Sequence, residues 1–277
     1  MKKVLAFDID QTLNVAKTPI PNEIADLLID LLEEDFLICP ISGQKFDQFK
    51  IQIVDRLVER GATADILRGL HLFVAQGTQY YRYSDAKTWS KGPVSLSIEM
   101  ESRPYDETKW QLVYDFPLSK DEAEKITSAL ETSAKKLGFW EEDKLADGDE
   151  IIENRLSQVT FSALGQRAGT EAKYAWDPDH KKRDAIVKEA KKLAPEFDYE
   201  VGGTTNINAF HPGMNKKFGM EHLMEELDVD MDEILYFGDM TQKGGNDYPV
   251  VEMGIETITV RSHEDTAYAL RGILGVL

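Results

Sequence analysis

Hydrophobic and polar residues follow one pattern at both ends of the chain and another in its middle. At both ends, short unbroken apolar runs are typical of strands buried on both faces of a sheet. Between these runs, apolar residues recur every three or four positions, which predicts amphipathic helices. The expected strands are 4–7, 36–41, 70–75, 234–237 and 257–260, and the expected helices are 24–32, 46–57, 220–227 and one that begins at Glu264.

The middle of the chain has the pattern of an α+β domain. Residues 94–101 alternate strictly between apolar and polar, as in a strand with one face in water. One helix is expected after Ser119, which forms a capping box with Glu122, and another is expected to start at Asp177-Pro178. Further strand-like segments are 110–116, 154–164 and 199–210.

Together the two patterns predict an α/β protein with an insertion. Strands that alternate with helices build a Rossmann-like parallel sheet with helices on both faces. We therefore expect a core domain made of residues 1–88 and 211–277. It would carry an inserted α+β cap domain with an antiparallel sheet at 89–210. The length of 277 residues is compatible with this division into about two domains.

Composition narrows the classes of partner. The chain has 32 Lys and Arg against 50 Asp and Glu, and this net charge of −18 disfavours nucleic acid and anionic membrane surfaces. No run approaches the ~18 apolar residues of a membrane span. Asp8 and Asp10 also interrupt the N-terminal apolar run before it reaches the length of a signal peptide. Cys39 is the single cysteine, so we expect a cytoplasmic protein, either a monomer or a homodimer.

The segment Asp8-Ile9-Asp10-Gln11-Thr12 follows the first expected strand. In an open α/β sheet, ligands bind outside the carboxyl ends of the strands. Two carboxylates two residues apart leave such a strand on the same side, so one can attack or bind a metal while the other transfers a proton. An isolated D-x-D pattern would more often be a solvated turn.

Three further elements support a catalytic interpretation. Ser42-Gly43 follows the second strand, and a small hydroxyl before a glycine can donate to a phosphoryl oxygen. Lys216 places a cation where a loop enters a helix, and the loop 238–247 gathers acids, amides and a Gly-Gly pair. Carboxylate oxygens suit Mg²⁺, and paired glycines allow close approach of the backbone. Each element is weak alone, but the ordered set of four is unlikely to arise by chance.

This ordered set resembles the haloacid dehalogenase (HAD) superfamily of phosphoryl-transfer enzymes. A long insertion after the third core strand resembles the type IIB capped subclass. The loop 238–247 is similar to the corresponding loop of the eukaryotic-type phosphomannomutases. The segments Val201-Gly202-Gly203 and Pro212-Gly213 also resemble their counterparts in that family. Position 11 departs from the family, which usually has glycine there.

The resemblance implies a role for each catalytic residue. Asp8 would be the nucleophile that forms an aspartyl-phosphate, and Asp10 would be the general acid/base. Ser42 and Lys216 would hold phosphoryl oxygens, and Lys216 would also damp the repulsion between Asp8 and the phosphate. An anionic nucleophile that approaches an anionic ester needs such neutralising groups.

The resemblance also implies a Mg²⁺ cofactor. Asp8, the backbone carbonyl of Asp10, and Asp239 would bind the ion, with support from Asp247 and Asn246. The implied substrate is a small phosphorylated molecule, most simply a sugar phosphate. Its binding residues would be Thr12, Lys17, Gly43, Arg155, Arg167, Lys173, Asn206, Asn208 and Asn246.

The substrate residues decide between two reactions. Phosphomannomutases hold the far phosphate of the sugar with arginines, but this chain has lysine at two of these places, Lys17 and Lys173. A lysine ammonium does not replace the planar fork of arginine. The main expectation is therefore a phosphatase of sugar phosphates or similar small phosphometabolites, and the alternative is a phosphomannomutase-type hexose phosphate mutase. Less favoured alternatives are a non-catalytic sugar-phosphate-binding protein and a glycosyltransferase that uses D-x-D for its metal.

Overall fold

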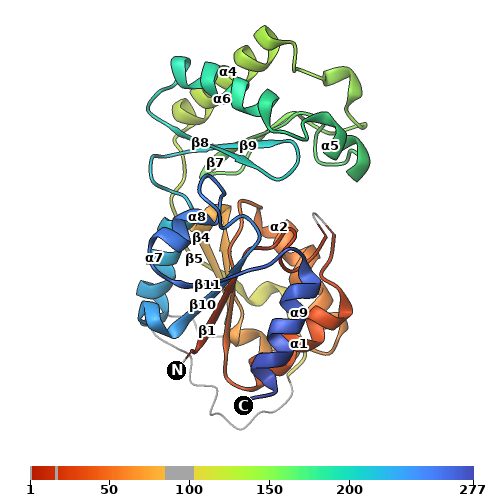
Figure 1. The fold of residues 1–277 in the computed structure, drawn as a ribbon, viewed down its shortest axis with the longest axis vertical. Coiled ribbons are helices and arrows are strands. Elements are labelled where there is room, and N and C mark those ends of the chain that lie inside the picture. The colour runs from red at the N-terminus through yellow and green to blue at the C-terminus, as the bar shows by residue number, and fades with distance from the viewer. Residues whose placement is uncertain (1, 16–17, 85–102) are drawn as a thin grey trace. The chain divides into compact units, whose positions relative to one another are not determined.

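The computed structural model of the chain describes residues 2–15, 18–84 and 103–277. The expected strand at 94–101 and the substrate candidate Lys17 lie outside these residues. The chain forms two compact units (Figure 1). Unit 1 consists of Met1–Asp115 and Asn215–Leu277, and unit 2 consists of Phe116–Met214.

Unit 1 is built on a parallel sheet, which confirms the predicted fold class. Its strands lie in the order β11 (Glu256–Thr259), β10 (Ile234–Gly238), β1 (Val4–Phe7) and β2 (Leu37–Pro40). Every residue of β10, β1 and β2 is buried. Unbroken apolar sequence is what a parallel sheet covered on both faces requires.

The sheet continues beyond β2 into an antiparallel edge. β3 (His71–Val74) follows β2 through parallel bridges, and β4 (Gln79–Tyr83) and β5 (Trp110–Asp115) complete an antiparallel set. The sequence prediction assigns 110–116 to the inserted domain, but β5 pairs with β4 along its length. Unit 1 therefore extends to Asp115 instead of ending at residue 88, because an alternating pattern predicts a strand without identifying its partner.

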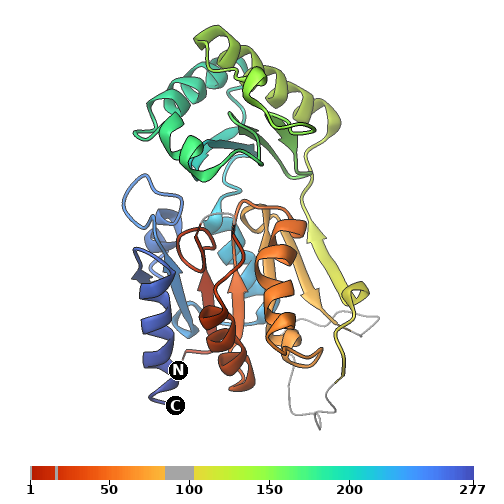
Figure 2. The same cartoon turned by 90° about the vertical axis from the view of Figure 1, so that its right-hand side faces the viewer.

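Helices cover both faces of this sheet. Figures 1 and 2 show α1 (Asn22–Glu33) and α9 (His263–Leu274) side by side on one face. The same apolar cluster includes the helical stretch of α2 (Phe46–Phe49), the π-helical turn Lys50–Val54 and α3 (Asp55–Glu59). The other face carries α7 (Lys216–Leu227) and α8 (Tyr248–Glu252).

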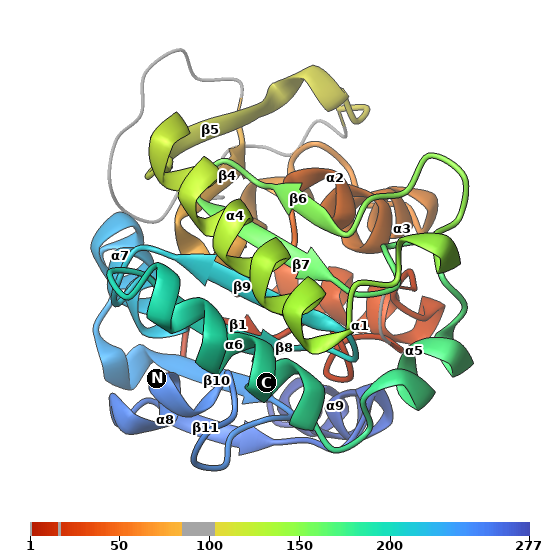
Figure 3. The same ribbon diagram turned by 90° about the horizontal axis from the view of Figure 1, so that it is seen from above.

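Unit 2 is a four-stranded antiparallel sheet with two long helices on one face. The strand order is β6 (Ile152–Asn154), β7 (Gln158–Ser162), β9 (Asn206–Phe210) and β8 (Asp198–Gly202). Figure 3 shows α4 (Lys120–Leu137) and α6 (Lys181–Leu193) next to each other over this sheet. The capping box of Ser119 and Glu122 is present at the start of α4.

Two details of unit 2 differ from the sequence prediction. The expected helix at Asp177-Pro178 begins later, as α6 at Lys181, and a short helix, α5 (Thr170–Trp176), precedes it. Asp177 still caps α6, because its carboxylate accepts the N–H groups of Lys182 and Arg183 from outside the first turn. The segment 199–210 is a hairpin of β8 and β9 rather than one strand. Among the described helices, none has both the length and the apolar character needed to cross a membrane.

Candidate active site

Strand alternation directs Asp8 toward α7. Its backbone N–H donates to the carbonyl of Phe237 at 2.9 Å, so Asp8 extends the pairing of β1 with β10. Ala6 pairs with Tyr236, and both side chains lie in the apolar cluster between the sheet and α7. Because side chains two residues apart share a face, Asp8 lies on that same side. The Asp8 side chain is almost fully buried there.

Lys216 reaches the same place from the first turn of α7. Asn215 caps this helix by accepting the N–H of Lys217. Gly219 allows α7 to pack against the loop after β3, because a Cβ at this position would lie 2.7 Å from the carbonyl oxygen of Gln76. A side chain at Gly219 would therefore push away the end of the helix that carries Lys216.

The side chains form a closed network around the Lys216 ammonium. Lys216 Nζ donates to Asp8 Oδ1, to Asp247 Oδ1 at 2.6 Å and to the hydroxyl of Tyr236 at 3.2 Å. The Tyr236 hydroxyl donates to the same Asp247 oxygen at 2.5 Å. The other Asp247 oxygen accepts the N–H of Met240 at 2.9 Å. Lys216, Tyr236 and Asp247 are completely buried.

Burial and like charges shape the electrostatics of this network. Burial raises the pKa of Asp8 well above its ordinary value, against the opposing effect of Lys216. Burial alone would lower the pKa of Lys216, but the carboxylates of Asp247 and Asp8 outweigh it and hold that pKa above the ordinary lysine value. Burial first, and then the charge of Asp247, raise the pKa of Asp239 to about 6. The site thus holds more negative charge than its single lysine balances.

The donor set fits a hard divalent cation. No three Asp, Glu, His or Cys side chains of the described residues converge closely enough to form a metal site by themselves. Mg²⁺ does not need such a cage, because it is usually held by one or two carboxylates, with substrate phosphate and water in the other positions. Asp8 and Asp239 offer two carboxylates, and burial together with the charge of Asp247 raises the pKa of Asp239, an effect that a bound cation would oppose.

The loops after β1, β2 and β10 carry the remaining candidates of unit 1. Thr266 of α9 fixes the first loop by donating to the carbonyl of Thr12, whereas the hydroxyl of Thr12 is buried without a hydrogen-bond partner in the described part of the chain. The side-chain oxygen of Asn246 is likewise buried without a hydrogen-bond partner among the described residues. Such atoms are costly to leave unpaired, so both suit contact with a ligand or water. Ser42, which precedes Gly43, is held by two backbone hydrogen bonds. Its N–H donates to the carbonyl of Phe73, and its carbonyl accepts the N–H of Gln76.

Asp10 lies in a tight turn closed on Asn14. Within it, Gln11 has a φ of +68°, in the left-handed region that glycine adopts without strain. At position 11 the turn therefore has a conformation that glycine would adopt readily, although the residue is glutamine.

Unit 2 brings two of its candidates together on the sheet face away from α4 and α6. Asn208 accepts from the hydroxyl of Thr160 at 2.9 Å, and Asn206 accepts from Ser162 at 2.8 Å. The intervening residues Phe161 and Ile207 pack under the helices. The result is a row of hydrogen-bonded hydroxyls and amides along β7 and β9. Sequence reasoning missed Thr160 and Ser162, although their polar-apolar alternation mirrors that of Asn206 and Asn208.

The cationic candidates of unit 2 are spread over three separate contacts. Arg155 pairs with Glu153 at 2.7 Å. Arg167 donates to the carbonyl of Asp147 at 2.8 Å, and Lys173 donates to that of Gln166 at 2.6 Å. Each is therefore already bonded to an acceptor of its own unit.

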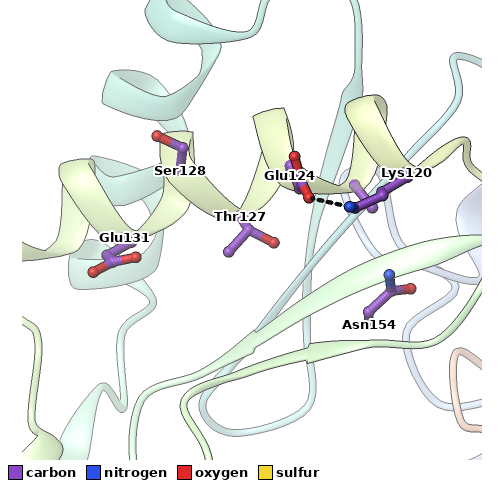
Figure 4. A pocket seen from close by; sticks show the side chains of 7 residues that line it. Lys120, Glu124, Thr127, Ser128, Glu131 and Asn154 are labelled. Atoms are coloured by element: carbon purple, nitrogen blue, oxygen red, sulfur yellow. Dashed lines mark ion pairs between the residues drawn. The ribbon is translucent and has the colours of Figure 1, made fainter.

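A cavity of about 370 Å³ lies along α4 in unit 2, and it contains none of the predicted site residues (Figure 4). Lys120 and Glu124 form an ion pair across one side of it, and Asn154 of β6 faces them. A second cavity of about 240 Å³ shares Thr127 and Glu131 with it. Neither cavity includes Asp8, Lys216 or any other residue of the network described above.

Comparisons with known proteins show similarity to phosphomannomutases. Residues 146–276 match the family model described as eukaryotic phosphomannomutase. A probable phosphomannomutase of Caenorhabditis elegans is 23% identical over 99% of this chain and 96% of its own length. The phosphomannomutase of Saccharomyces cerevisiae is 30% identical over 43% of this chain and 48% of its own length.

Solved structures share the fold. A haloacid dehalogenase-like hydrolase from Bacteroides thetaiotaomicron has a TM-score of 0.59 at 13% identity, covering 99% of this chain and 100% of that one. An IMP-nucleotidase of Plasmodium falciparum has a TM-score of 0.63 at 15% identity, covering 98% of this chain and 70% of that one.

The fold is that of haloacid dehalogenase-like hydrolases, and together the similarities support a member of the HAD superfamily. Its relatives are phosphomannomutases and HAD-type phosphatases, and the chain is an enzyme of this phosphoryl-transfer class. Within the superfamily it lies near the phosphomannomutases.

Proposed function

We propose that this enzyme is a phosphomannomutase-type hexose phosphate mutase that works through an aspartyl-phosphate. The observation that carries phosphoryl transfer is the buried Lys216 ammonium bonded to Asp8 at the carboxyl end of β1. The mutase is favoured over the phosphatase because the phosphomannomutase model matches residues of both units. The full-length relative aligned over 99% of the chain carries the same name.

In this mechanism an oxygen of Asp8 attacks phosphorus while the bond to the leaving sugar oxygen breaks. Asp10 gives that oxygen a proton and later takes one back from the hydroxyl that receives the phosphoryl group. Lys216 keeps its positive charge, because its pKa lies above the ordinary lysine value, and so reduces the repulsion between Asp8 and the phosphate. Ser42 donates its hydroxyl to a phosphoryl oxygen.

Mg²⁺ is part of the proposal. Asp8, Asp239 and the carbonyl of Asp10 would hold it, with Asp247 and Asn246 in support. Bound there, the ion would supply positive charge to the transferring phosphoryl oxygens.

Each unit carries residues that we propose as substrate contacts. Thr12, Gly43 and Asn246 would contact the transferring phosphoryl group. Asn206 and Asn208 would bind sugar hydroxyls. The row of hydroxyls and amides along β7 and β9 supports this interpretation. The candidates for binding the other phosphate are cationic: they are Arg155, Arg167 and Lys173 in unit 2 and, considered separately, Lys17 near the N-terminus.

A phosphatase of sugar phosphates remains the second candidate, because one observation favours it. Glu153 already pairs with Arg155, which is the cation that best matches the mutase pattern. A weaker hold on the far phosphate would let the sugar leave before the phosphoryl group returns to it, and water would then release that group from Asp8.

One assay separates the two reactions. The protein is incubated with Mg²⁺ and a panel of hexose phosphates, with and without a hexose bisphosphate. Interconversion of mannose 1-phosphate and mannose 6-phosphate without net phosphate release is expected. Release of free phosphate without interconversion would replace the mutase by the phosphatase, and absence of both reactions would contradict phosphoryl transfer on sugars. Asp8→Asn is the matched control, since it removes the nucleophile and keeps the side-chain size.

We also propose a cytoplasmic location and no nucleic-acid or membrane partner. The buried free thiol of Cys39 and the net charge of −18 support this proposal.

A further inference from the structure

Tyr236 contributes to the active-site network, although the sequence patterns assign it only to a buried strand. It lies in β10, between β1 and β11, and is completely buried. Its hydroxyl accepts a hydrogen bond from Lys216 and donates one to Asp247. Lys216, Asp247 and Tyr236 therefore form a closed triangle of hydrogen bonds, in which Tyr236 is the uncharged member.

The ammonium of Lys216 has no spare hydrogen in this arrangement. A lysine carries three N–H donors, and Lys216 directs them at Asp8, Asp247 and Tyr236. A phosphoryl oxygen that approaches Asp8 can receive a hydrogen bond from Lys216 only if one of these contacts is given up. The ammonium must therefore exchange an acceptor whenever phosphate binds.

Of the three hydrogen bonds that Lys216 donates, the one to the Tyr236 hydroxyl costs the least free energy to break. Hydrogen bonds between two ionised groups are stronger than those to a neutral hydroxyl. The distance from Lys216 to Tyr236 is 3.2 Å, compared with 2.6 Å to Asp247. After the exchange, the Tyr236 hydroxyl still donates to Asp247, so its buried proton keeps a partner.

We propose that Tyr236 is a positioning residue that holds the third N–H of Lys216 until a phosphoryl oxygen takes its place. The rigid ring fixes the end of a long, flexible side chain opposite Asp8, and its neutral hydroxyl can release that side chain without leaving a buried charge. The inference rests on the proposed phosphoryl transfer. It concerns the phosphate-binding step and not the identity of the sugar.

The test is Tyr236→Phe, with Tyr80→Phe as a matched control. Tyr80 is also a completely buried tyrosine of unit 1, and its hydroxyl is hydrogen-bonded to His71 instead of to the network. The phenylalanine at 236 leaves one N–H of Lys216 unpaired before phosphate binds, whereas the wild type begins with that N–H paired. We therefore expect Tyr236→Phe to bind inorganic phosphate about fivefold more tightly in calorimetry at fixed Mg²⁺. We also expect its kcat to fall about tenfold, because the ammonium is no longer fixed opposite Asp8.

The control and a spectroscopic measurement exclude a general loss of structure. Tyr80→Phe is expected to keep the phosphate affinity and kcat of the wild type, and no partly misfolded variant would bind phosphate more tightly. Phosphate should also produce a tyrosine difference spectrum in the wild type and in Tyr80→Phe that is absent in Tyr236→Phe. If Tyr236→Phe does not fold, the same spectrum is still recorded for the other two proteins.

Unchanged or weaker phosphate binding in folded Tyr236→Phe would overturn the inference, as would the absence of a tyrosine signal in the wild type. The binding measurement needs no turnover. A failure of the mutase assay with normal phosphate binding would therefore reject the proposed reaction and leave this inference standing.

Discussion

Replacing Asp239 by asparagine should make the metal-free protein more stable while it removes activity. The pKa of Asp239 lies at about 6, against an ordinary value of 3.8, so folding makes its ionised form unfavourable. One pKa unit corresponds to about 1.4 kcal/mol, so the ionised group lowers the free energy of unfolding by about 3 kcal/mol at pH 8. Asp239 is partly exposed and shares charge with its neighbours, which reduces the expected gain to roughly 1–2 kcal/mol.

The sign of the pH dependence follows from the raised pKa. Between pH 3.8 and about 6 the folded protein binds the Asp239 proton more tightly than the unfolded chain does. Stability from this group is therefore present at low pH and lost as the pH rises through about 6. Asparagine does not titrate, so the advantage of Asp239→Asn should be largest at pH 8 and roughly half as large at pH 5.

Urea unfolding in EDTA at pH 8 and pH 5 measures this effect. Asp265→Asn is the matched control, because Arg261 lowers the pKa of Asp265 to about 2 and its loss should bring no gain at pH 8. Added Mg²⁺ should stabilise the wild type and not Asp239→Asn. A variant that is no more stable than the wild type at pH 8 without metal would show that the Asp239 carboxylate does not oppose folding.

Three further predictions test other parts of the structure. Asp8→Asn should abolish turnover of every hexose phosphate, and EDTA should do the same reversibly in the wild type, as followed by sugar-phosphate interconversion. Arg183→Met should lower the free energy of unfolding of unit 2 by about 3–5 kcal/mol in urea, because it leaves the buried carboxylate of Asp177 without its partner. Gly219→Ala should lower the free energy of unfolding by about 1–3 kcal/mol and reduce kcat, because the added Cβ overlaps the loop after β3. Gly272→Ala in α9 is the control, because the added Cβ has no atom within 4 Å. The free energy of unfolding of that variant should be unchanged or higher by up to ~1 kcal/mol.

The sequence predicts the core sheet of unit 1 well and places the candidate site residues in the loops that follow its strands, because both depend on local features. Buried parallel strands such as β1 and β10 are short apolar runs, and the polar residues that end them lie where ligands bind. Asp8 is therefore identifiable once all four motifs are considered together, and its contact with Lys216, 208 residues away, is what the family resemblance implies.

Features that depend on a distant partner are not predictable in this way. The segment of β5 has the pattern of a strand, but only its pairing with β4 assigns it to unit 1. The sequence prediction starts α6 too early, because Asp177 caps this helix although it lies four residues before Lys181. Tyr236 lies within an apolar run, so its sequence context gives no sign that its hydroxyl bonds to Lys216 and Asp247.

The charge of the site is an argument for function rather than for stability. Burial raises the pKa values of Asp8 and Asp239, the charge of Asp247 raises both further, and Asp10 adds to the effect on Asp239. One lysine cannot balance four neighbouring acids, so the folded chain keeps an arrangement that opposes its own folding. The imbalance has a use only if a cation and an ester phosphate meet there. The acids then hold the cation, and the cation with Lys216 admits the phosphate into a protein whose net charge of −18 would otherwise repel it.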